Sequence, residues 1–389
     1  MSEPTVSEHP AVYQKHDSFV GIRHHGALAQ DVLNRVRRLF DQLSSMALAP
    51  NVTKVLRCAC EELLAPDTLA QPLVPFTLRS YVIEEISRLT DEELRRYLFY
   101  RYRYEIYPQR HIIDAFPPCL QVEPTSVCNY RCVFCYQQDR TFSTKGSGHM
   151  GAMSFDLFRS VIDQAEGRCE ALTLASRGEP LLCPDIQQML GYVKGKFLAL
   201  KMNTNASRLT ERLCHAILEA GVNTLVFSAD AASEPAYGRL RVGGRFDQVH
   251  ANIARFKEIR AKHYPNARTI TRVSGVKVEG TPGLDEMERV WGDLVDQVAF
   301  VQYNPWNTTY ERPLHRLTAP CSELWLRMFV WWDGAVNPCE NDYKSTLSVG
   351  NATEDLGSLW RSSQYTRLRE QHLQRQRGAC SPCNRCPVI

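Results

Sequence analysis

Three cysteines at a C-x3-C-x2-C spacing, Cys128, Cys132 and Cys135, follow directly after the apolar–polar run 120–123. Cysteine thiolates are the soft ligands that iron–sulfur clusters require. Three thiolates on one short loop can hold three irons of a [4Fe–4S] cluster, which leaves one iron open to a substrate or cofactor. A zinc knuckle or a chance spacing is the alternative interpretation, because the chain contains 14 cysteines.

Short apolar runs alternate with helical patterns between about residues 119 and 305. The predicted strands cover 120–123, 171–174, 198–203, 224–228, 270–278 and 298–303. The predicted helices cover 154–166, 185–195, 210–220, 247–263 and 284–296. This alternation predicts an α/β fold with parallel strands and crossover helices. Six units are too few for a closed eight-stranded barrel, so we expect a partial (β/α)6 barrel.

Polar residues end several of these predicted strands. They form the segments Ser176–Pro180, Asn203–Asn205 and Ser228–Asp230, and the fifth strand contains Arg272 and Ser274. Active sites of such folds gather at the C-terminal ends of the strands. We therefore expect a common rim that binds a zwitterion and a ribose, although each segment alone could be a capped turn.

Taken together, the cysteine spacing with Phe134 before its last cysteine and the Gly-Glu-Pro segment after the second strand resemble the radical S-adenosylmethionine (radical SAM) enzymes. The resemblance covers about residues 119–305. It implies that Cys128, Cys132 and Cys135 hold a [4Fe–4S] cluster that chelates S-adenosylmethionine. The residues that it implies for binding S-adenosylmethionine itself are Phe134, Tyr136, Gly178, Glu179, Pro180, Asn203, Ser228 and Arg272.

Within that set, the resemblance implies a separate part of the cofactor for each residue. Glu179 in the Gly-Glu-Pro segment would hold the amino group, and Phe134 and Tyr136 would flank the adenine. Asn203, Ser228 and Arg272 would meet the ribose and the carboxylate.

Radical SAM chemistry begins when the cluster reduces the sulfonium, which yields methionine and a 5′-deoxyadenosyl radical that abstracts a hydrogen atom from an unactivated carbon. Electron transfer to a second cluster would leave an oxidised substrate, whereas hydrogen return from a thiol would leave an epimer. Cys183 follows Glu179 by four residues, so we predict it as a candidate catalytic hydrogen donor. The alternative is a structural thiol under the following helix, because buried thiols are common.

The C-terminal region carries five further cysteines. Cys321 and Cys339 enclose the segment 331–334, which predicts a β-hairpin turn. Cys380, Cys383 and Cys386 copy three ligands of the bacterial ferredoxin spacing. This arrangement resembles the SPASM/Twitch auxiliary-cluster domain, and five cysteines suit one [4Fe–4S] cluster of the shorter Twitch type. Which of the last three cysteines is spare stays open, and a zinc ribbon is the alternative.

The N-terminal region has a helical pattern from about residue 26 to 107, after a loose lead-in over 1–20. Thr90-Asp91-Glu92-Glu93 predicts a capping box. The helix that it opens carries arginines among aromatic residues, which favours a solvated arginine face over a nucleic-acid surface. We therefore divide the chain into a helical region 1–115, a radical SAM partial barrel 116–310 and a small hairpin-and-helix auxiliary domain 311–389.

Composition limits the classes of binding partner and the cellular location that we expect for this protein. A net charge of +3 does not favour nucleic acid or a membrane surface, and no apolar run approaches the ~20 residues of a spanning helix. The N-terminus lacks the pattern of a secretory signal. Fourteen cysteines in such a chain predict metal binding or reactive thiols rather than disulfides, and we expect a reducing cytoplasm.

Two substrate classes compete. The five C-terminal cysteines and the helical N-terminus favour a carbohydrate-like small molecule that is epimerised or dehydrogenated, with a peptide substrate as the alternative. A flavodoxin- or ferredoxin-type protein would supply electrons. A non-catalytic iron–sulfur or zinc scaffold is the remaining hypothesis, and it has no use for Glu179.

Overall fold

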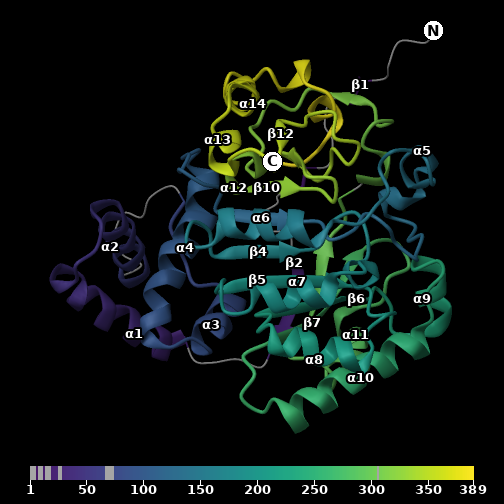
Figure 1. Cartoon of the computed structure of the whole chain (residues 1–389), viewed down its shortest axis with the longest axis horizontal. Helices are drawn as coiled ribbons and strands as arrows, with labels where there is room; N and C mark the ends of the chain where they lie inside the picture. The colour runs from purple at the N-terminus through teal and green to yellow at the C-terminus, as the bar shows by residue number, and fades with distance from the viewer. Residues whose placement is uncertain (1–5, 8–11, 14–18, 25–28, 66–73, 305) are drawn as a thin grey trace.

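A single ten-stranded sheet forms the centre of the computed structural model, which describes residues 6–7, 12–13, 19–24, 29–65, 74–304 and 306–389. The strands lie in the order β12-β11-β10-β3-β4-β5-β6-β7-β8-β2. Figure 1 shows β4 and β5 of this sheet near the centre of the molecule. Their bounds are β2 Phe19–His24, β3 Cys119–Val122, β4 Ala171–Leu174, β5 Ala199–Thr204, β6 Thr224–Ser228, β7 Ile270–Lys277, β8 Gln297–Gln302, β10 Arg327–Val330, β11 Ala335–Asn337 and β12 Gly350–Asn351. A separate two-stranded pair joins β1 (Val6–Ser7) and β9 (Leu314–His315).

Strands β3 to β8 are parallel and consecutive, which confirms the six predicted β/α units. The intervening helices are α6 Phe155–Ala165, α7 Ile186–Val193, α8 Glu211–Glu219, α9 Glu234–Leu240, α10 Phe246–His263 and α11 Leu284–Trp291. All of these were predicted within a few residues except α9. Every residue of β3 and β4 is buried, as expected for parallel strands covered on both faces.

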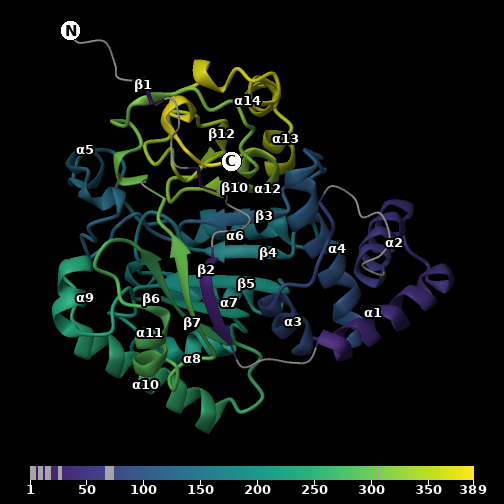
Figure 2. The same ribbon diagram turned by 180° about the vertical axis from the view of Figure 1, so that it is seen from behind.

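Both edges of the sheet come from outside the predicted barrel. Strand β10 pairs in parallel with β3, in the register Arg327 with Cys119. Strand β2 pairs antiparallel with β8 and appears as the purple strand in Figure 2. The lead-in predicted over residues 1–20 lies mostly outside the described residues, but its last two residues belong to β2. The boundaries at 115 and 310 therefore remain predictions.

Four helices make up most of the N-terminal region: α1 Ala29–Gln42, α2 Pro50–Leu64, α3 Ser80–Ser87 and α4 Asp91–Gln109. The predicted capping box is confirmed, since the Glu93 amide donates to Thr90 Oγ1 over 3.2 Å and Thr90 N donates to Glu93 Oε2 over 2.8 Å. The core of this bundle extends to Cys119 and Ala171, the first residues of β3 and β4. The helices therefore pack against the N-terminal ends of these barrel strands.

The arginine face predicted on α4 is wrong in part. Arg101 and Arg103 are only 6% and 7% exposed. Arg101 pairs with Glu105 over 2.6 Å and lies 5.2 Å from the ring centroid of Tyr104. These cations help to pack α4 rather than to present charge to solvent, because their carboxylate and aromatic partners compensate their burial.

The C-terminal region combines the β10–β11 hairpin, which confirms the predicted turn, with α12 Glu323–Leu326, α13 Leu356–Trp360 and α14 Ser363–Leu373. Its last residues return to the N-terminal segment, because Tyr13 N donates to Pro387 O and Ile389 N donates to Tyr13 O, each over 3.0 Å. The remaining short helices are η2 Leu43–Ser45, η3 Tyr136–Gln138, α5 Arg140–Ser143, η4 Pro180–Leu182, η5 Trp306–Thr308, η6 Arg377–Ala379 and η7 Cys383–Arg385. Within the described ranges, no helix has both the length and the apolar character that crossing a membrane requires.

Candidate active site

The cysteine loop lies between β3 and α6 and borders a cavity of about 480 Å³. Cys128, Cys132 and Cys135 all line this cavity. A second segment holds the loop in place, because Arg131 N donates to Val242 O over 2.9 Å and Val133 N donates to the carbonyl of residue 240 over 3.1 Å. The loop is therefore anchored by backbone bonds on the side of α9.

The Gly-Glu-Pro segment packs directly on the chain that leads into the cysteine loop. Glu179 N donates to Val127 O over 2.9 Å. A Cβ atom on Gly178 would lie 2.3 Å from Thr125 O, so only glycine fits there without a backbone shift. Pro180 begins the short helix η4 and also fixes the direction of the chain after Glu179. Gly178 thus lets the Gly-Glu-Pro segment pack closely against the backbone that precedes the cysteine loop.

Glu179 is a buried carboxylate that faces the same cavity. Its oxygens accept hydrogen bonds from the Thr204 hydroxyl (2.6 Å), Asn205 N (2.7 Å) and Leu181 N (3.2 Å). Burial raises the pKa of Glu179, and the bond from Asn205 N works against that rise. Among the described residues, no Lys, Arg or His side chain forms an ion pair with it. A ligand ammonium would supply the missing counter-charge.

Three other residues predicted for the rim, Ser176, Asn203 and Ser228, also line the cavity. Ser176 Oγ and Asn203 Oδ1 are buried and have no hydrogen-bond partner within the described part of the chain. Buried polar atoms are normally satisfied, so these two are available to a bound polar molecule. Asn205 was not predicted as a ligand-site residue, although its backbone N donates to Glu179 and its Nδ2 donates to Asn129 Oδ1 over 3.1 Å.

Arg241 is the most important residue that the sequence analysis missed. It is buried, pairs with Asp230, and places Nη1 3.7 Å from Cys132 Sγ. Asp230 is held in turn by Val276 N. Burial raises the pKa of the Cys132 thiol, and the positive charge of Arg241 opposes that rise. The spacing of Asp230 and Arg241, on two sides of α9, offered no local signal, because only the fold brings them to the cysteine loop.

The aromatic residues beside the last cysteine have different neighbours. Phe134 lies under Arg241, whose Cζ is 5.4 Å from the ring centroid. Tyr136 is stacked on Tyr343 at 5.0 Å and donates its hydroxyl to Ser176 O over 2.9 Å. Both rings line the cavity. Tyr343 covers one face of Tyr136 and Arg241 lies over the ring of Phe134, so the adenine-flanking role of both rings remains a prediction.

Cys183 lies outside this group. It is 3% exposed, packs its Sγ 4.0 Å from Met189 Sδ, and is not among the residues that line the cavity. Burial raises the pKa of its thiol to about 11. This position favours the structural role under α7 over the predicted hydrogen donor, because a donor must reach the substrate radical.

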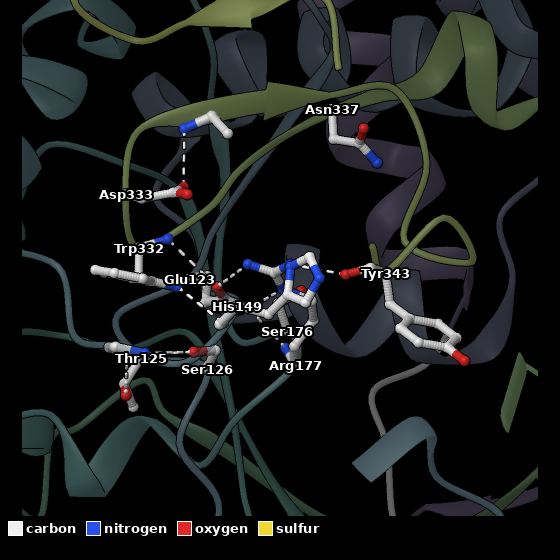
Figure 3. A network of polar contacts seen from close by, with 12 residues as sticks. Glu123, Thr125, Ser126, His149, Ser176, Arg177, Trp332, Asp333, Asn337 and Tyr343 are labelled. Atoms are coloured by element: carbon white, nitrogen blue, oxygen red, sulfur yellow. Dashed lines mark hydrogen bonds and ion pairs between the residues drawn. The ribbon is translucent and has the colours of Figure 1, made fainter. Parts of the chain in front are cut away.

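A buried ion pair connects this site to the C-terminal hairpin (Figure 3). Arg177 binds Glu123 through Nε (2.8 Å) and Nη2 (2.7 Å), and both side chains are 2% exposed or less. Arg177 also donates to Tyr343 O over 2.8 Å, and Trp332 N donates to Glu123 over 3.3 Å. The residue that precedes Gly178 therefore ties the Gly-Glu-Pro segment to the region after β10.

The C-terminal cysteines surround a much smaller cavity of about 20 Å³. Cys321, Cys339, Cys383 and Cys386 line it, whereas Cys380 does not and instead directs its Sγ to Ser381 O over 3.8 Å. Asn341 Nδ2 donates to Cys386 Sγ over 2.9 Å. All fourteen cysteines of the chain are free thiols.

Two side chains close this small cavity from α14 and η6. The amide of Cys321 donates to His372 Nδ1 over 3.2 Å, which leaves Nε2 as the protonated nitrogen of a neutral ring. Burial lowers the pKa of His372 to about 3. Arg377 is fully buried and donates to Val388 O over 2.7 Å and to Cys383 O over 3.0 Å.

The donor sets suit iron–sulfur clusters by their chemistry, since both consist of buried or half-buried thiols. Cys132 has a cationic neighbour in Arg241, and Cys386 accepts a hydrogen bond from Asn341. Three His, Cys, Asp or Glu side chains do not gather closely enough to hold a single metal ion anywhere in the described ranges. The unpaired carboxylate of Glu179 and the orphaned Ser176 and Asn203 atoms match an amino acid-containing ligand such as S-adenosylmethionine.

Known proteins resemble this chain in sequence over both cysteine regions. Residues 122–277 match the radical SAM superfamily, and residues 321–387 match the SPASM iron–sulfur cluster-binding domain. A tungsten-containing aldehyde ferredoxin oxidoreductase cofactor-modifying protein of Pyrococcus furiosus is 25% identical over 305 residues, which is 64% of this chain and 82% of that protein. A mycofactocin maturase of Mycobacterium tuberculosis is 27% identical over 35% of this chain, but the match spans only 33% of that protein.

Among solved structures, Streptococcus suis SuiB bound to the precursor peptide SuiA superposes with a TM-score of 0.51 at 12% identity, over 88% of this chain and 80% of that one. That likeness concerns the fold alone. The two family matches coincide with the two cysteine regions, and they imply S-adenosylmethionine, a [4Fe–4S] cluster that binds it and auxiliary iron–sulfur binding. The chain is therefore a member of the radical SAM superfamily with a C-terminal SPASM domain.

Proposed function

We propose that this radical SAM enzyme abstracts a hydrogen atom from a small, polar, carbohydrate-like molecule and releases it in an oxidised form. The observation that carries the proposal is the cavity of about 480 Å³ that Cys128, Glu179 and the inner faces of the barrel strands share. Ligand pockets span about 300–1,000 Å³. A cavity of this size that also holds S-adenosylmethionine leaves room for a small reacting group.

Different residues around the cavity would bind different groups of the ligand. Glu179 offers its buried carboxyl group to an ammonium group, and Ser176 and Asn203 offer polar atoms that have no hydrogen-bond partner among the described residues. The Arg241–Asp230 pair holds a positive charge beside Cys132. When bound, the cluster and S-adenosylmethionine supply a 5′-deoxyadenosyl radical for hydrogen abstraction. The buried side chains around them enclose that radical, which limits its reaction with groups other than the substrate.

Oxidation is favoured over epimerisation by the surroundings of the thiols. Cys183 does not line the cavity, so it is poorly placed to return a hydrogen atom. The substrate would lose one hydrogen atom, then pass one electron to the auxiliary iron–sulfur site and one proton to solvent. Cys321, Cys339, Cys383 and Cys386 are the proposed ligands of that site, with Cys380 as the spare thiol.

Peptide modification is the second candidate function. It is favoured by the likeness to a mycofactocin maturase and by the fold shared with SuiB, a structure solved with a precursor peptide. In that case one peptide side chain, rather than a whole small molecule, would occupy the cavity. We also propose a flavodoxin- or ferredoxin-type electron donor and a cytoplasmic location, which the fourteen free thiols support.

The test is anaerobic incubation of the reconstituted protein with dithionite and S-adenosylmethionine, followed by measurement of 5′-deoxyadenosine. Candidate sugars, aminocyclitols and peptides are then added, and the product mass is determined. A loss of two hydrogens from a sugar-like substrate supports the proposal, and the same loss from a peptide supports the second candidate. No 5′-deoxyadenosine under any condition would favour the non-catalytic scaffold.

A further inference from the structure

The cavity extends beyond the rim toward the side of the barrel that α3 and α4 cover, where Tyr81 and Tyr104 line it. Arg272 on β7 lies in this deeper part. It is in register with Val226 and Gln297, two residues before Ser274, which pairs with Ser228 at the rim. Two residues of an extended strand span about 7 Å. Arg272 therefore lies about 7 Å along the strand from the level of Ser228.

The guanidinium of Arg272 is fixed on one edge and one face. Its Nε donates to Gln297 Oε1 over 2.7 Å. Its Cζ lies 5.1 Å from the ring centroid of Phe19 and 6.0 Å from that of Tyr81. The two terminal nitrogens donate no hydrogen bond to any residue that the structure describes. The side chain is 6% exposed and lines the cavity, so this unoccupied edge is available to a ligand inside it.

Charge distinguishes Arg272 from other arginines of the same cavity. Arg88, Arg101, Arg177, Arg241 and Arg268 each form an ion pair with a carboxylate. Within the described ranges no carboxylate lies within the 4.0 Å ion-pair limit of Arg272.

Two acids of α3, Glu84 and Glu85, act on Arg272 electrostatically, and both already have other partners. Glu84 pairs with Arg88 over 2.8 Å, and Glu85 accepts from the Tyr97 hydroxyl and lies 3.8 Å from Arg101. Burial lowers the pKa of Arg272, although Glu85 opposes that change. A guanidinium stays charged at neutral pH, so Arg272 is a buried positive charge that forms no ion pair with a described carboxylate. Glu84 is linked to it only through Gln297, which accepts from Arg272 Nε and donates to Glu84.

We propose that Arg272 binds the anionic group of the substrate, a carboxylate or a phosphate, in the deep part of the cavity. The guanidinium fork matches both groups with two parallel hydrogen bonds. The inference rests on the proposed function, because it takes this cavity as the substrate site. It replaces the cofactor role that the sequence resemblance implied for Arg272, since the cofactor-binding segments end at the rim.

The experiment measures binding of glucose, glucose 6-phosphate and glucuronate by calorimetry to the reconstituted holoprotein in the presence of S-adenosylmethionine. At least one acidic sugar should bind about tenfold to a hundredfold more tightly than glucose, as expected for charge-assisted hydrogen bonds. The two acidic probes separate phosphate from carboxylate recognition. Arg272→Gln should abolish this preference, and Arg272→Lys should keep part of it.

Arg212→Gln is the matched control, because Arg212 is an exposed arginine on α8 that does not line the cavity. Circular dichroism and iron content establish that each variant is folded and loaded. Equal affinity for the three sugars, no binding of either acidic sugar at millimolar concentration, or an Arg272→Gln variant that retains the preference would overturn the proposal. If Arg272→Gln weakened S-adenosylmethionine binding but kept the preference for acidic sugars, the result would indicate that Arg272 binds the cofactor instead. Cleavage of S-adenosylmethionine, measured separately, reports on the proposed function itself.

Discussion

The two cysteine sites of this protein differ most in the space around them. The first, on the loop after β3, borders a cavity of about 480 Å³, whereas the second surrounds about 20 Å³. Burial raises the pKa of a thiol in each, to about 12 for both Cys128 and Cys321. The thiols of the two sites are thus similar, and the sites differ in the space that they leave for a ligand. Space for a ligand indicates chemistry at the first site, and its lack indicates electron transfer or structure at the second.

The polar side chains beside the two cysteine sites also differ in whether they can bind an added molecule. Beside the first site, Glu179 forms no ion pair with a described residue, and Ser176 Oγ and Asn203 Oδ1 have no hydrogen-bond partner in the described part of the chain, so an added molecule can bind all three. Beside the second, Arg377 donates its hydrogen bonds to carbonyl groups of the chain itself. An arginine that caps backbone carbonyls fixes a loop and offers little to a substrate. Variants at each site should therefore have separable effects.

Replacing Cys128, Cys132 and Cys135 together by alanine should have the largest effect, complete loss of S-adenosylmethionine cleavage. We predict about eight irons in the wild-type protein, as two [4Fe–4S] clusters, and about half of that in the triple variant. Iron analysis and 5′-deoxyadenosine measurement check both numbers.

The matched control is Cys58→Ala, which removes a half-buried thiol of α2 far from both sites in the sequence. It should retain the iron and the cleavage activity. Iron near four in the wild-type protein, with zinc making up the difference, would contradict the assignment of the second site to an iron–sulfur cluster.

Replacing Cys321 and Cys339 by alanine should remove the other half of the iron and leave cleavage of S-adenosylmethionine intact. The oxidised product should disappear, because the substrate radical would have no nearby electron acceptor. The comparison of 5′-deoxyadenosine with product in one reaction measures this uncoupling. If cleavage fell as far as in the triple variant, the two sites would not be separable in the way their cavities indicate.

Local patterns in the sequence were enough to predict the barrel strands, the capping box at Thr90 and the β10–β11 hairpin. They could not predict that β10 extends the barrel sheet beside β3, because the pairing joins residues 119 and 327. Arg241 was missed for the same reason, since only tertiary structure brings it to Cys132. Arg101 and Arg103 were misassigned because arginine normally lies at the surface, and their buried partners come from the folded bundle.

The buried Glu123–Arg177 pair ties the first site to the C-terminal hairpin region, so breaking it should destabilise the protein. Arg177→Met leaves Glu123 as a buried, unpaired carboxylate, which typically costs about 3–5 kcal/mol. Chemical denaturation of the loaded protein measures the change in the free energy of unfolding. Arg159→Met, which breaks the exposed pair with Asp156, should cost at most about 1 kcal/mol. Equal effects of the two variants would show that the pair does not couple the regions.

Glu179→Gln should weaken S-adenosylmethionine binding and keep both clusters. Loss of a charge-assisted hydrogen bond costs about 1.5–3 kcal/mol, which is about tenfold to 150-fold in affinity. Because burial raises the pKa of Glu179, affinity in the wild-type protein should also fall as the pH drops toward that pKa and the carboxylate takes up a proton. Calorimetry at several pH values measures both effects. Glu211→Gln, an exposed substitution on α8, is the control. Unchanged affinity in Glu179→Gln would place the ammonium of the ligand elsewhere.

Cys183→Ala should have the smallest effect. Its sulfur packs on Met189 in the core and does not line the cavity, so its removal leaves a small void and changes no catalytic contact. Turnover in D2O should install no solvent-derived hydrogen in the wild-type product, and the variant should give the same product at a similar rate. One deuterium in the wild-type product, lost in Cys183→Ala together with a change from an epimer to a ketone, would contradict this expectation. It would mean that the loop after Glu179 moves during turnover and brings the thiol to the substrate. The substrate radical could then take a hydrogen atom from Cys183 at the first site, and electron transfer to the second site would no longer be its only route to a product.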